Sequence, residues 1–319
     1  MDTQILSADA AGIKTACDWL AQGMPVAVPT ETVYGLAADA RNSKAVARIY
    51  EAKGRPSFNP LIVHLPDLAE VAKIATLGPQ ARALAEAFWP GPLTMVLPLR
   101  AQSGIASITT AGLDTVGIRV PSHAGMQRLM RAFGGPLAAP SANPSGRVSA
   151  TSAQHVADIE SGLGGRIPAV LDDGASPVGV ESTIIGWSDD GQPALLRPGG
   201  LPAEAIEALL GVRLLHPESN HDAPTSPGQL LSHYAPSVGL RMEVRDPAPH
   251  ETYLAFGPSD HSHALNLSES GDLTEAAAQL FDLLRRADLL GRAIAVAPIP
   301  ETGLGAAIND RLRRAAAPR

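Results

Sequence analysis

The segment KGRPSFNP at residues 53–60 places a polar side chain at every second position, between glycine and proline residues. These side chains are Lys53, Arg55, Ser57 and Asn59. If the segment is extended, side chains two residues apart point to the same side, so two cations and two polar groups would face one ligand. Ammonium and guanidinium groups bind phosphate oxygens, which predicts a phosphate-binding strip. Glycine, proline, serine and asparagine are also typical of a surface turn, so this segment alone leaves both interpretations open.

Six further segments also place polar side chains among apolar residues, prolines and glycines: PTETVYGLAADA, FWPGPLTMVL, TVGIRVPSH, PSANPSGRVSA, ESTIIG and LLRPGG. Together with the first segment, they contain the basic residues Lys53, Arg55, Arg119, Arg147 and Arg197. Their hydroxyl and amide residues are Thr30, Thr32, Ser57, Asn59, Thr115, Ser141, Asn143, Ser149, Ser182 and Thr183. This set suits a triphosphate, because arginine forks and hydroxyls bind phosphate oxygens without a glycine-rich loop. Turn chemistry explains any one segment about equally well, but it explains all seven together much less well.

Groups for general acid–base catalysis are few in these segments, and the main candidates are His64, Glu31 and Glu181. This shortage fits a reaction on a nucleotide that needs mainly positioning and charge neutralisation. The sequence contains no P-loop motif, no nucleophile elbow and no cysteine-rich metal pattern.

The composition predicts a soluble cytoplasmic protein with more than one domain. A chain of 319 residues is longer than the length at which proteins usually keep a single hydrophobic core. The single cysteine, Cys17, excludes an internal disulfide framework, and no apolar run reaches the roughly 18 residues of a membrane span. A net charge of -7 argues against tight, sequence-independent binding of nucleic acid.

The pattern of apolar residues predicts an α/β fold. Short apolar runs predict strands at 25–30, 61–65, 93–99, 115–121, 137–142, 169–174 and 182–187. Helical patterns lie at 11–23, 43–53, 79–88, 123–133, 151–159 and 202–210. Residues 1–212 are therefore predicted to form a domain with a large, twisted, mixed sheet. Residues 213–239 have the composition of a linker, and 240–319 alternate strands and helices as in a small Rossmann-like α/β domain.

Six motifs in order, PTETVYGL, KGRP-x-x-NPL, WPGPLT, TVGIRVP, PSAN-x-SG and LRPG, resemble the YrdC-type domain of threonylcarbamoyl-AMP synthases. The segments SPGQLLSHYAP and GLGAAINDRLRRAA are similar to the linker and C-terminal domain of the two-domain members of that family. The resemblance implies a concave, positively charged face on the twisted sheet. It also implies a nucleotidyltransferase that converts L-threonine, bicarbonate or CO2, and ATP, with Mg2+, into L-threonylcarbamoyl-AMP and pyrophosphate. Partner proteins would then transfer the threonylcarbamoyl group to the adenosine beside the anticodon of tRNA, without membrane attachment or stable tRNA binding by this chain.

The resemblance also implies roles for individual residues. The catalytic residues would be Lys53, Arg55, Ser141 and Asn143. ATP would contact Arg55, Asn59, Thr115, Ser141, Ser149, Arg197 and Tyr234. L-threonine would contact Thr32, His64, Arg119, Ala139 and Ser182, with Ala139 using its backbone, and no side chain is assigned to a metal ion. The linker, through Tyr234, would act as a lid, and Ser232 stands where the family pattern has a basic residue.

Two other functions stay open at this point. An RNA-binding module would use the concave basic face, but the acidic net charge and the aromatic content of 4% argue against it. A carbamoyl-adenylate enzyme with another acceptor is the second alternative, as in hydrogenase-maturation carbamoyltransferases. Those proteins carry acylphosphatase-like and zinc-finger regions, for which this sequence shows no pattern.

Overall fold

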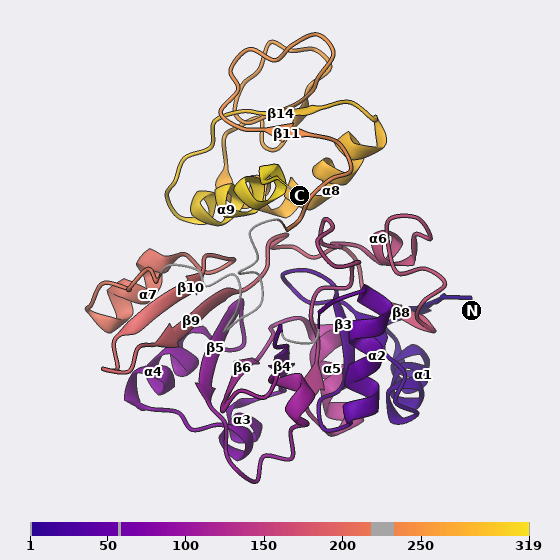
Figure 1. Ribbon diagram of the computed structural model, residues 1–319, viewed down its shortest axis with the longest axis vertical. Coiled ribbons are helices and arrows are strands. Elements are labelled where there is room, and N and C mark those ends of the chain that lie inside the picture. Colours follow the sequence, from indigo (N-terminus) through magenta and orange to yellow (C-terminus); the bar gives the residue numbers. More distant parts are fainter. Residues whose placement is uncertain (1, 57–58, 218–232, 319) are drawn as a thin grey trace.

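The chain forms a large unit on a ten-stranded sheet and a small unit on a four-stranded sheet (Figure 1). The structure is a computed structural model that describes residues 2–56, 59–217 and 233–318. The predicted α/β class, with a large mixed sheet and a second small parallel sheet, is confirmed. Among the described residues, no helix combines the length and apolarity needed to cross a membrane.

The large sheet has the strand order β1-β8-β2-β3-β7-β4-β6-β5-β9-β10 and mixes parallel with antiparallel neighbours. Its strands are β1 (Gln4–Ser7), β2 (Val26–Val28), β3 (Gly35–Asp39), β4 (Ile62–His64), β5 (Leu93–Pro98), β6 (Thr115–Arg119), β7 (Leu137–Ala138), β8 (Ala169–Asp172), β9 (Thr183–Trp187) and β10 (Pro193–Arg197).

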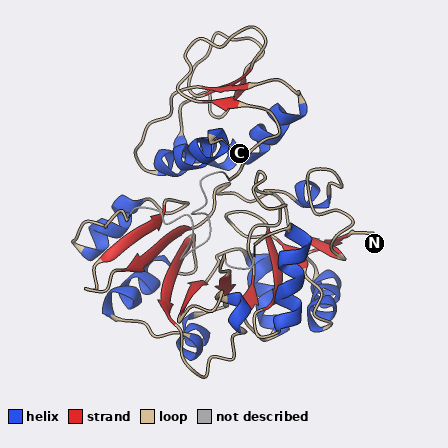
Figure 2. Cartoon of the chain, in the orientation of Figure 1, coloured by secondary structure: helices blue, strands red, loops and turns tan. Residues whose placement is uncertain are grey.

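Helices cover both faces of this sheet, as Figure 2 shows. They are α1 (Ala10–Ala21), α2 (Ser43–Lys53), α3 (Leu68–Ile74), α4 (Pro79–Phe88), α5 (Ala124–Phe133), α6 (Ala153–Ala157), α7 (Ala203–Leu210) and the 3-10 turn η1 (Ser107–Thr109). Strand β2 shows how the two cores arise. Val26 and Val28 pack with α1 and α5, whereas Ala27 belongs to the core under α2. Successive side chains of a strand point to opposite faces, so an unbroken apolar strand is buried on both sides.

The small unit is a parallel sheet of β11 (Leu240–Arg241), β14 (Ile294–Val296), β12 (Thr252–Ala255) and β13 (Leu265–Asn266). Its helices α8 (Leu273–Leu289) and α9 (Leu304–Ala316) lie between this sheet and the large unit (Figure 1). The apolar core of the small unit extends into loops of the large unit, because it includes Val33, Val148 and Val180. The two units are therefore joined by apolar packing.

Several predicted elements differ from the structure. The sequence analysis does not predict β1, β3, β10, β11 or α3, and it makes β7 and α6 longer than they are. The extended strip KGRPSFNP is wrong at its start, because Lys53 is the last residue of α2. Asn42 caps the beginning of this helix, and Gly54 ends it in the left-handed conformation (φ 59°), which glycine adopts without strain. Ser57 lies outside the described residues, as do 218–232 of the predicted linker, including Ser232.

Candidate active site

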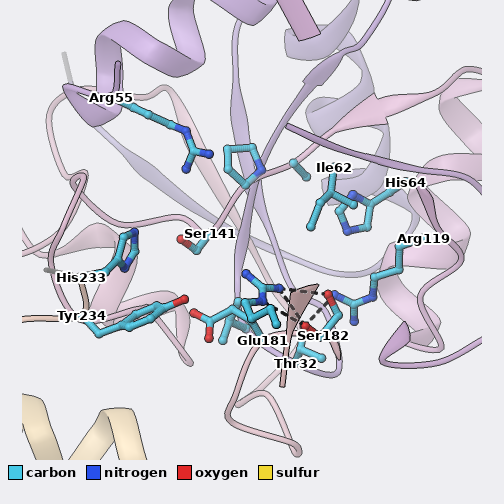
Figure 3. A pocket seen from close by; sticks show the side chains of 14 residues that line it. Thr32, Arg55, Ile62, His64, Arg119, Ser141, Glu181, Ser182, His233 and Tyr234 are labelled. Atoms are coloured by element: carbon cyan, nitrogen blue, oxygen red, sulfur yellow. Dashed lines mark hydrogen bonds between the residues drawn. The ribbon is translucent and has the colours of Figure 1, made fainter. Parts of the chain in front are cut away.

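A pocket opens at one edge of the large sheet, where strand ends and loops converge (Figure 3). Strands β4 and β6 are parallel neighbours and end side by side at His64 and Arg119. Strand β5 runs antiparallel to β6 and parallel to β9, which brings the start of β9 and the preceding Ser182 to the same edge. The hydroxyls of Ser182 and Thr94 are 2.7 Å apart. The register of these strands thus assembles residues that are far apart in the sequence.

One end of the pocket is built around Arg119 (Figure 3). Its Nη1 donates to the Thr32 hydroxyl at 2.8 Å, its Nη2 pairs with Glu31 at 2.7 Å, and its Nε lies 3.4 Å from the Gly91 carbonyl oxygen. Burial by itself would raise the pKa of Glu31, but the charge of Arg119 leaves this pKa below its usual value. A guanidinium has five N–H groups. Hydrogen bonds engage Nε and one N–H of Nη1, whereas Nη2 makes an ion pair but no hydrogen bond among the described residues, so Nη1 and Nη2 keep N–H groups that suit a ligand such as a carboxylate.

His64 lies beside Arg119 and is almost fully buried, with no hydrogen-bond partner at Nδ1 among the described residues. Burial, and then the charge of Arg119, lower the pKa of His64 to about 3. The imidazole is therefore neutral near pH 7 and is suited to hydrogen bonding with a ligand.

The other end of the pocket, called the cationic end below, carries Arg55, and Arg197 lies between the two ends, beside Ser182. Arg55 Nη2 donates to the Pro60 carbonyl oxygen at 3.1 Å, whereas its buried Nε has no hydrogen-bond partner among the described residues. Burial lowers the pKa of Arg55 to about 10, so the side chain remains charged at neutral pH. Arg197 donates through Nε and Nη2 to the Ser182 carbonyl oxygen, at 3.2 and 2.8 Å. A buried charged N–H group without a partner is costly, and an anion bound here would remove that cost.

Lys53 does not line the pocket but supports one of its loops. Its buried ammonium donates to the carbonyl oxygens of Ser141 (2.5 Å) and Asn143 (2.6 Å). Burial, together with the Arg55 charge, lowers the pKa of Lys53 well below its usual value. The Asn143 amide donates to the Pro144 and Arg147 carbonyl oxygens in the same loop. Lys53 and Asn143 therefore fix the loop that presents Ser141 to the pocket.

Glu181 is the acidic residue of the pocket lining. Its carboxylate accepts a hydrogen bond from Ser149 and pairs with Arg311 of α9 at 3.0 Å. Burial alone would raise the pKa of Glu181, but Arg311, Arg197 and the Ser149 hydroxyl leave it lowered. The carboxylate is therefore ionised at neutral pH.

His233 and Tyr234 close the cationic end of the pocket (Figure 3). Tyr234 is fully buried, has a φ of 61° and stacks on Phe281 of α8, with 5.6 Å between ring centroids. A positive φ is uncommon for a bulky residue and persists only where the surroundings hold it. Burial lowers the pKa of His233 to about 3, so this imidazole is also neutral.

The pocket collects most of the predicted site residues. Those that line it are Thr32, Arg55, His64, Arg119, Ala139, Ser141, Ser182, Arg197 and Tyr234. Those outside the lining are Lys53, Asn59, Thr115, Asn143 and Ser149. Thr115 begins the strand that Arg119 ends, which separates the two by about 13 Å at 3.3 Å per residue.

The sequence analysis assigns no ligand role to five lining residues: Val33, Ile62, Pro140, Glu181 and His233. His233 could have been found from its position next to Tyr234 in the SHYAP segment. The sequence indicates Glu181 only as a candidate acid–base group, because its partner Arg311 lies 130 residues away.

Comparison with known proteins identifies the family. Residues 18–199 match the Sua5_yciO_yrdC family, described as "Telomere recombination", and 201–317 match the family described as "Threonylcarbamoyl-AMP synthase, C-terminal domain". Over 337 residues the chain is 40% identical to the Threonylcarbamoyl-AMP synthase of Bacillus subtilis, covering 98% of this chain and 95% of that protein. The chain belongs to the threonylcarbamoyl-AMP synthase family.

A sequence match and a structure match from Pyrococcus abyssi extend this family relationship. The Threonylcarbamoyl-AMP synthase of that organism is 40% identical to this chain, with 95% of this chain and 93% of that protein covered. The crystal structure of Pyrococcus abyssi Sua5 complexed with L-threonine matches with a TM-score of 0.89 and 38% identity, and the match covers 98% of each chain. Membership of the threonylcarbamoyl-AMP synthase family thus extends over both units of the fold.

Proposed function

We propose that this chain synthesises L-threonylcarbamoyl-AMP from L-threonine, bicarbonate or CO2, and ATP, with release of pyrophosphate. The observation that carries the proposal is the two-ended pocket. An end with Arg55, whose buried Nε has no hydrogen-bond partner among the described residues, suits phosphate, and an end with Thr32, His64 and Arg119 suits an amino acid. Relatives over nearly the full length carry the name of this activity, and one solved relative is complexed with L-threonine.

The proposed reaction needs orientation more than proton transfer. The amine of threonine combines with CO2 to give a carbamate and one proton. A carbamate oxygen then attacks the α-phosphorus of ATP, a new P–O bond forms, and the bond between that phosphorus and the β-phosphate oxygen breaks to release pyrophosphate. His64 and His233 are neutral, and Glu31 and Glu181 are engaged in ion pairs. The pocket is therefore built to hold charge at fixed positions, which is the main requirement of such a displacement.

At the amino-acid end, we assign the threonine carboxylate to N–H groups of Arg119 Nη1 and Nη2. Glu31 and Thr32 already hold the guanidinium in place, so little side-chain entropy is lost when the ligand binds. His64 offers a neutral ring nitrogen, and Ala139 and Ser182 complete this end of the pocket.

We assign ATP phosphates to Arg55 at the cationic end and to Arg197, with Ser141 between the two ends of the pocket. Tyr234 covers the nucleotide from the linker. Three predicted residues would act indirectly. Lys53 and Asn143 fix the loop that carries Ser141, and Ser149 fixes the carboxylate of Glu181. Contacts of ATP with Asn59 and Thr115 remain proposals from the sequence, because neither residue lines the pocket.

We propose that Mg2+ enters with ATP and is held by phosphate oxygens and water. In the described part of the chain, no three His, Cys, Asp or Glu side chains gather as a metal site, and Glu181 is already paired with Arg311. Mg2+ usually retains several water ligands and binds through substrate phosphates, so a site without a full set of protein ligands is compatible with it. When bound, the ion would neutralise phosphate charge.

The division of the chain and its wider role are also proposed. Helix α7 packs on α4, and its Ile206 belongs to the core of the large sheet, which supports a catalytic unit of residues 1–212. Residues 213–239 would be the linker that covers the site, and 240–319 the second domain. The product would pass, in the cytoplasm, to proteins that modify tRNA beside the anticodon.

The test is pyrophosphate release from ATP by the full chain. Release should require both threonine and bicarbonate, and release that does not depend on threonine would reject the proposal. Arg55→Ala should lower turnover at least about 100-fold, because a phosphate-binding guanidinium is lost, while the thermal unfolding midpoint changes little. The exposed Arg82→Ala is the matched control and should behave as wild type. Near-normal turnover of Arg55→Ala would remove this residue from the site.

A further inference from the structure

Arg311 of α9 reaches from the small unit into the wall of the pocket. It is fully buried, its Nε donates to Glu181 at 3.0 Å, and its Nη1 donates to the Pro198 carbonyl oxygen at 2.5 Å. Its guanidinium carbon also lies 5.5 Å from the centre of the Tyr234 ring, within cation–π range. One arginine of the C-terminal helix thus contacts two side chains that line the pocket.

The contact matters because of the charge on Glu181. This carboxylate is ionised and buried at the cationic end, where the triphosphate is proposed to bind. Without a counter-ion it would repel the phosphates strongly, because charge interactions are weakly screened in a buried site. The Arg311 guanidinium, whose Nη1 also pairs with Asp310 at 3.1 Å, supplies the main counter-ion from outside the pocket, and the charge of Arg197 adds to it. The Ser149 hydroxyl fixes the second carboxylate oxygen.

Arg311 is not needed simply to attach the small unit. That attachment includes apolar packing of Val33, Val148 and Val180 with the core of the small unit. It also includes Arg285 of α8, which donates to the Val148 carbonyl oxygen at 2.5 Å. A buried ion pair has a high desolvation cost, and apolar residues of similar volume would stabilise the contact between the two units as well or better. The ion pair of Arg311 and Glu181 lies at the pocket wall, which indicates a role in ligand binding rather than in attachment of the small unit.

We propose that Arg311 is a positioning residue for ATP: it cancels the charge of Glu181 and holds Tyr234, so that the C-terminal domain completes the nucleotide end of the pocket. This inference rests on the proposed function. It gives the C-terminal domain a defined part in ATP binding.

The experiment measures ATP affinity by calorimetry, and KM for ATP and threonine by pyrophosphate release, in the full chain. Arg311→Met should weaken ATP binding at least about tenfold and leave KM for threonine within about twofold, because Glu181, at the nucleotide end, loses its main counter-ion. Adding Glu181→Gln to this variant should restore most of the ATP affinity, since the repelling charge is gone while the amide oxygen still accepts from Ser149. Arg311→Lys, which keeps a cation, should lose less affinity than Arg311→Met.

Arg313→Met is the matched control, because Arg313 lies on the same helix in an exposed ion pair with Glu301. It should bind ATP as wild type does. The inference is overturned if Arg311→Met binds ATP normally, or if the double variant binds no better than Arg311→Met, which would indicate a purely structural role. If Arg311→Met does not fold, the double variant Arg311→Met with Glu181→Gln is compared with Arg313→Met instead. ATP binding by the double variant that is at least about tenfold weaker than that of Arg313→Met would then overturn the inference, because no carboxylate charge is left at position 181 to cause the loss. Failure of the wild type to release pyrophosphate with threonine would instead reject the proposed function.

Discussion

Replacing Lys53 by methionine separates two roles for this side chain. The sequence predicts an ammonium group that binds ATP phosphates, whereas the structure places it on the carbonyl oxygens of Ser141 and Asn143, at 2.5 and 2.6 Å. Methionine has a similar length but no donor. It would leave both carbonyl oxygens without this partner and free the loop that carries Ser141.

The size of the effect follows from these two bonds. A hydrogen bond from a charged donor contributes about 1.5–3 kcal/mol, so the loss of two would cost about 3–6 kcal/mol. Removing the buried ammonium also removes its desolvation penalty, which offsets part of this loss. We expect Lys53→Met to lower the free energy of unfolding by about 2–4 kcal/mol.

Urea unfolding followed by circular dichroism measures this change, and calorimetry measures ATP affinity in parallel. Lys44→Met is the matched control, because Lys44 lies on the same helix α2 with an exposed side chain, and it should unfold as wild type does. Should Lys53→Met unfold at the wild-type urea concentration while ATP affinity falls, Lys53 would bind phosphate directly and our reasoning would be refuted.

Three further predictions concern the titratable groups Glu31 and His64 and the packing between the two units. Burial alone would raise the pKa of Glu31, but Arg119 lowers it below 4.5, so this pair stabilises the fold above about pH 4.5 and the contribution is lost as the pH falls further. Glu31→Gln should therefore lose less stability than wild type between about pH 6 and pH 3. His64 should stay neutral down to about pH 5, because burial and then Arg119 lower its pKa to about 3, and NMR titration of its imidazole checks this. Gly179→Leu should lower pyrophosphate release at least about tenfold, because a Cβ there would lie 2.2 Å from the Ala277 carbonyl oxygen of α8 and the φ is +75°.

Each of these predictions has a contradicting result. Equal acid sensitivity of wild type and Glu31→Gln would show that the pair does not contribute to stability. An imidazole of His64 that titrates near pH 6.5 would show that the ring is open to water. For the packing between the two units, Gly191→Ala is the control, since Gly191 also has a positive φ (80°) but open space around it. Equal activity of Gly179→Leu and this control would show that the packing of α8 does not affect the site.

Local sequence patterns are sufficient to predict the longer helices and strands. Helix α2 has an Asn42 cap, a buried face and a Gly54 stop, and its predicted range of 43–53 is the observed one. Strand β3, with the sequence GLAAD, is buried and yet was not predicted. Its small residues carry little intrinsic strand preference, and its neighbours β2 and β7 determine its conformation.

The sequence by itself determined the fold class, the family and nine of the residues that line the pocket, because motifs and apolar periodicity are local properties of the chain. Only the tertiary structure decided how the predicted site residues are used. It placed Lys53 on the backbone oxygens of Ser141 and Asn143, 88 and 90 residues further along the chain. It also brought Arg311 to Glu181 across 130 residues, a contact that depends on how two separately built units pack and that no local pattern encodes.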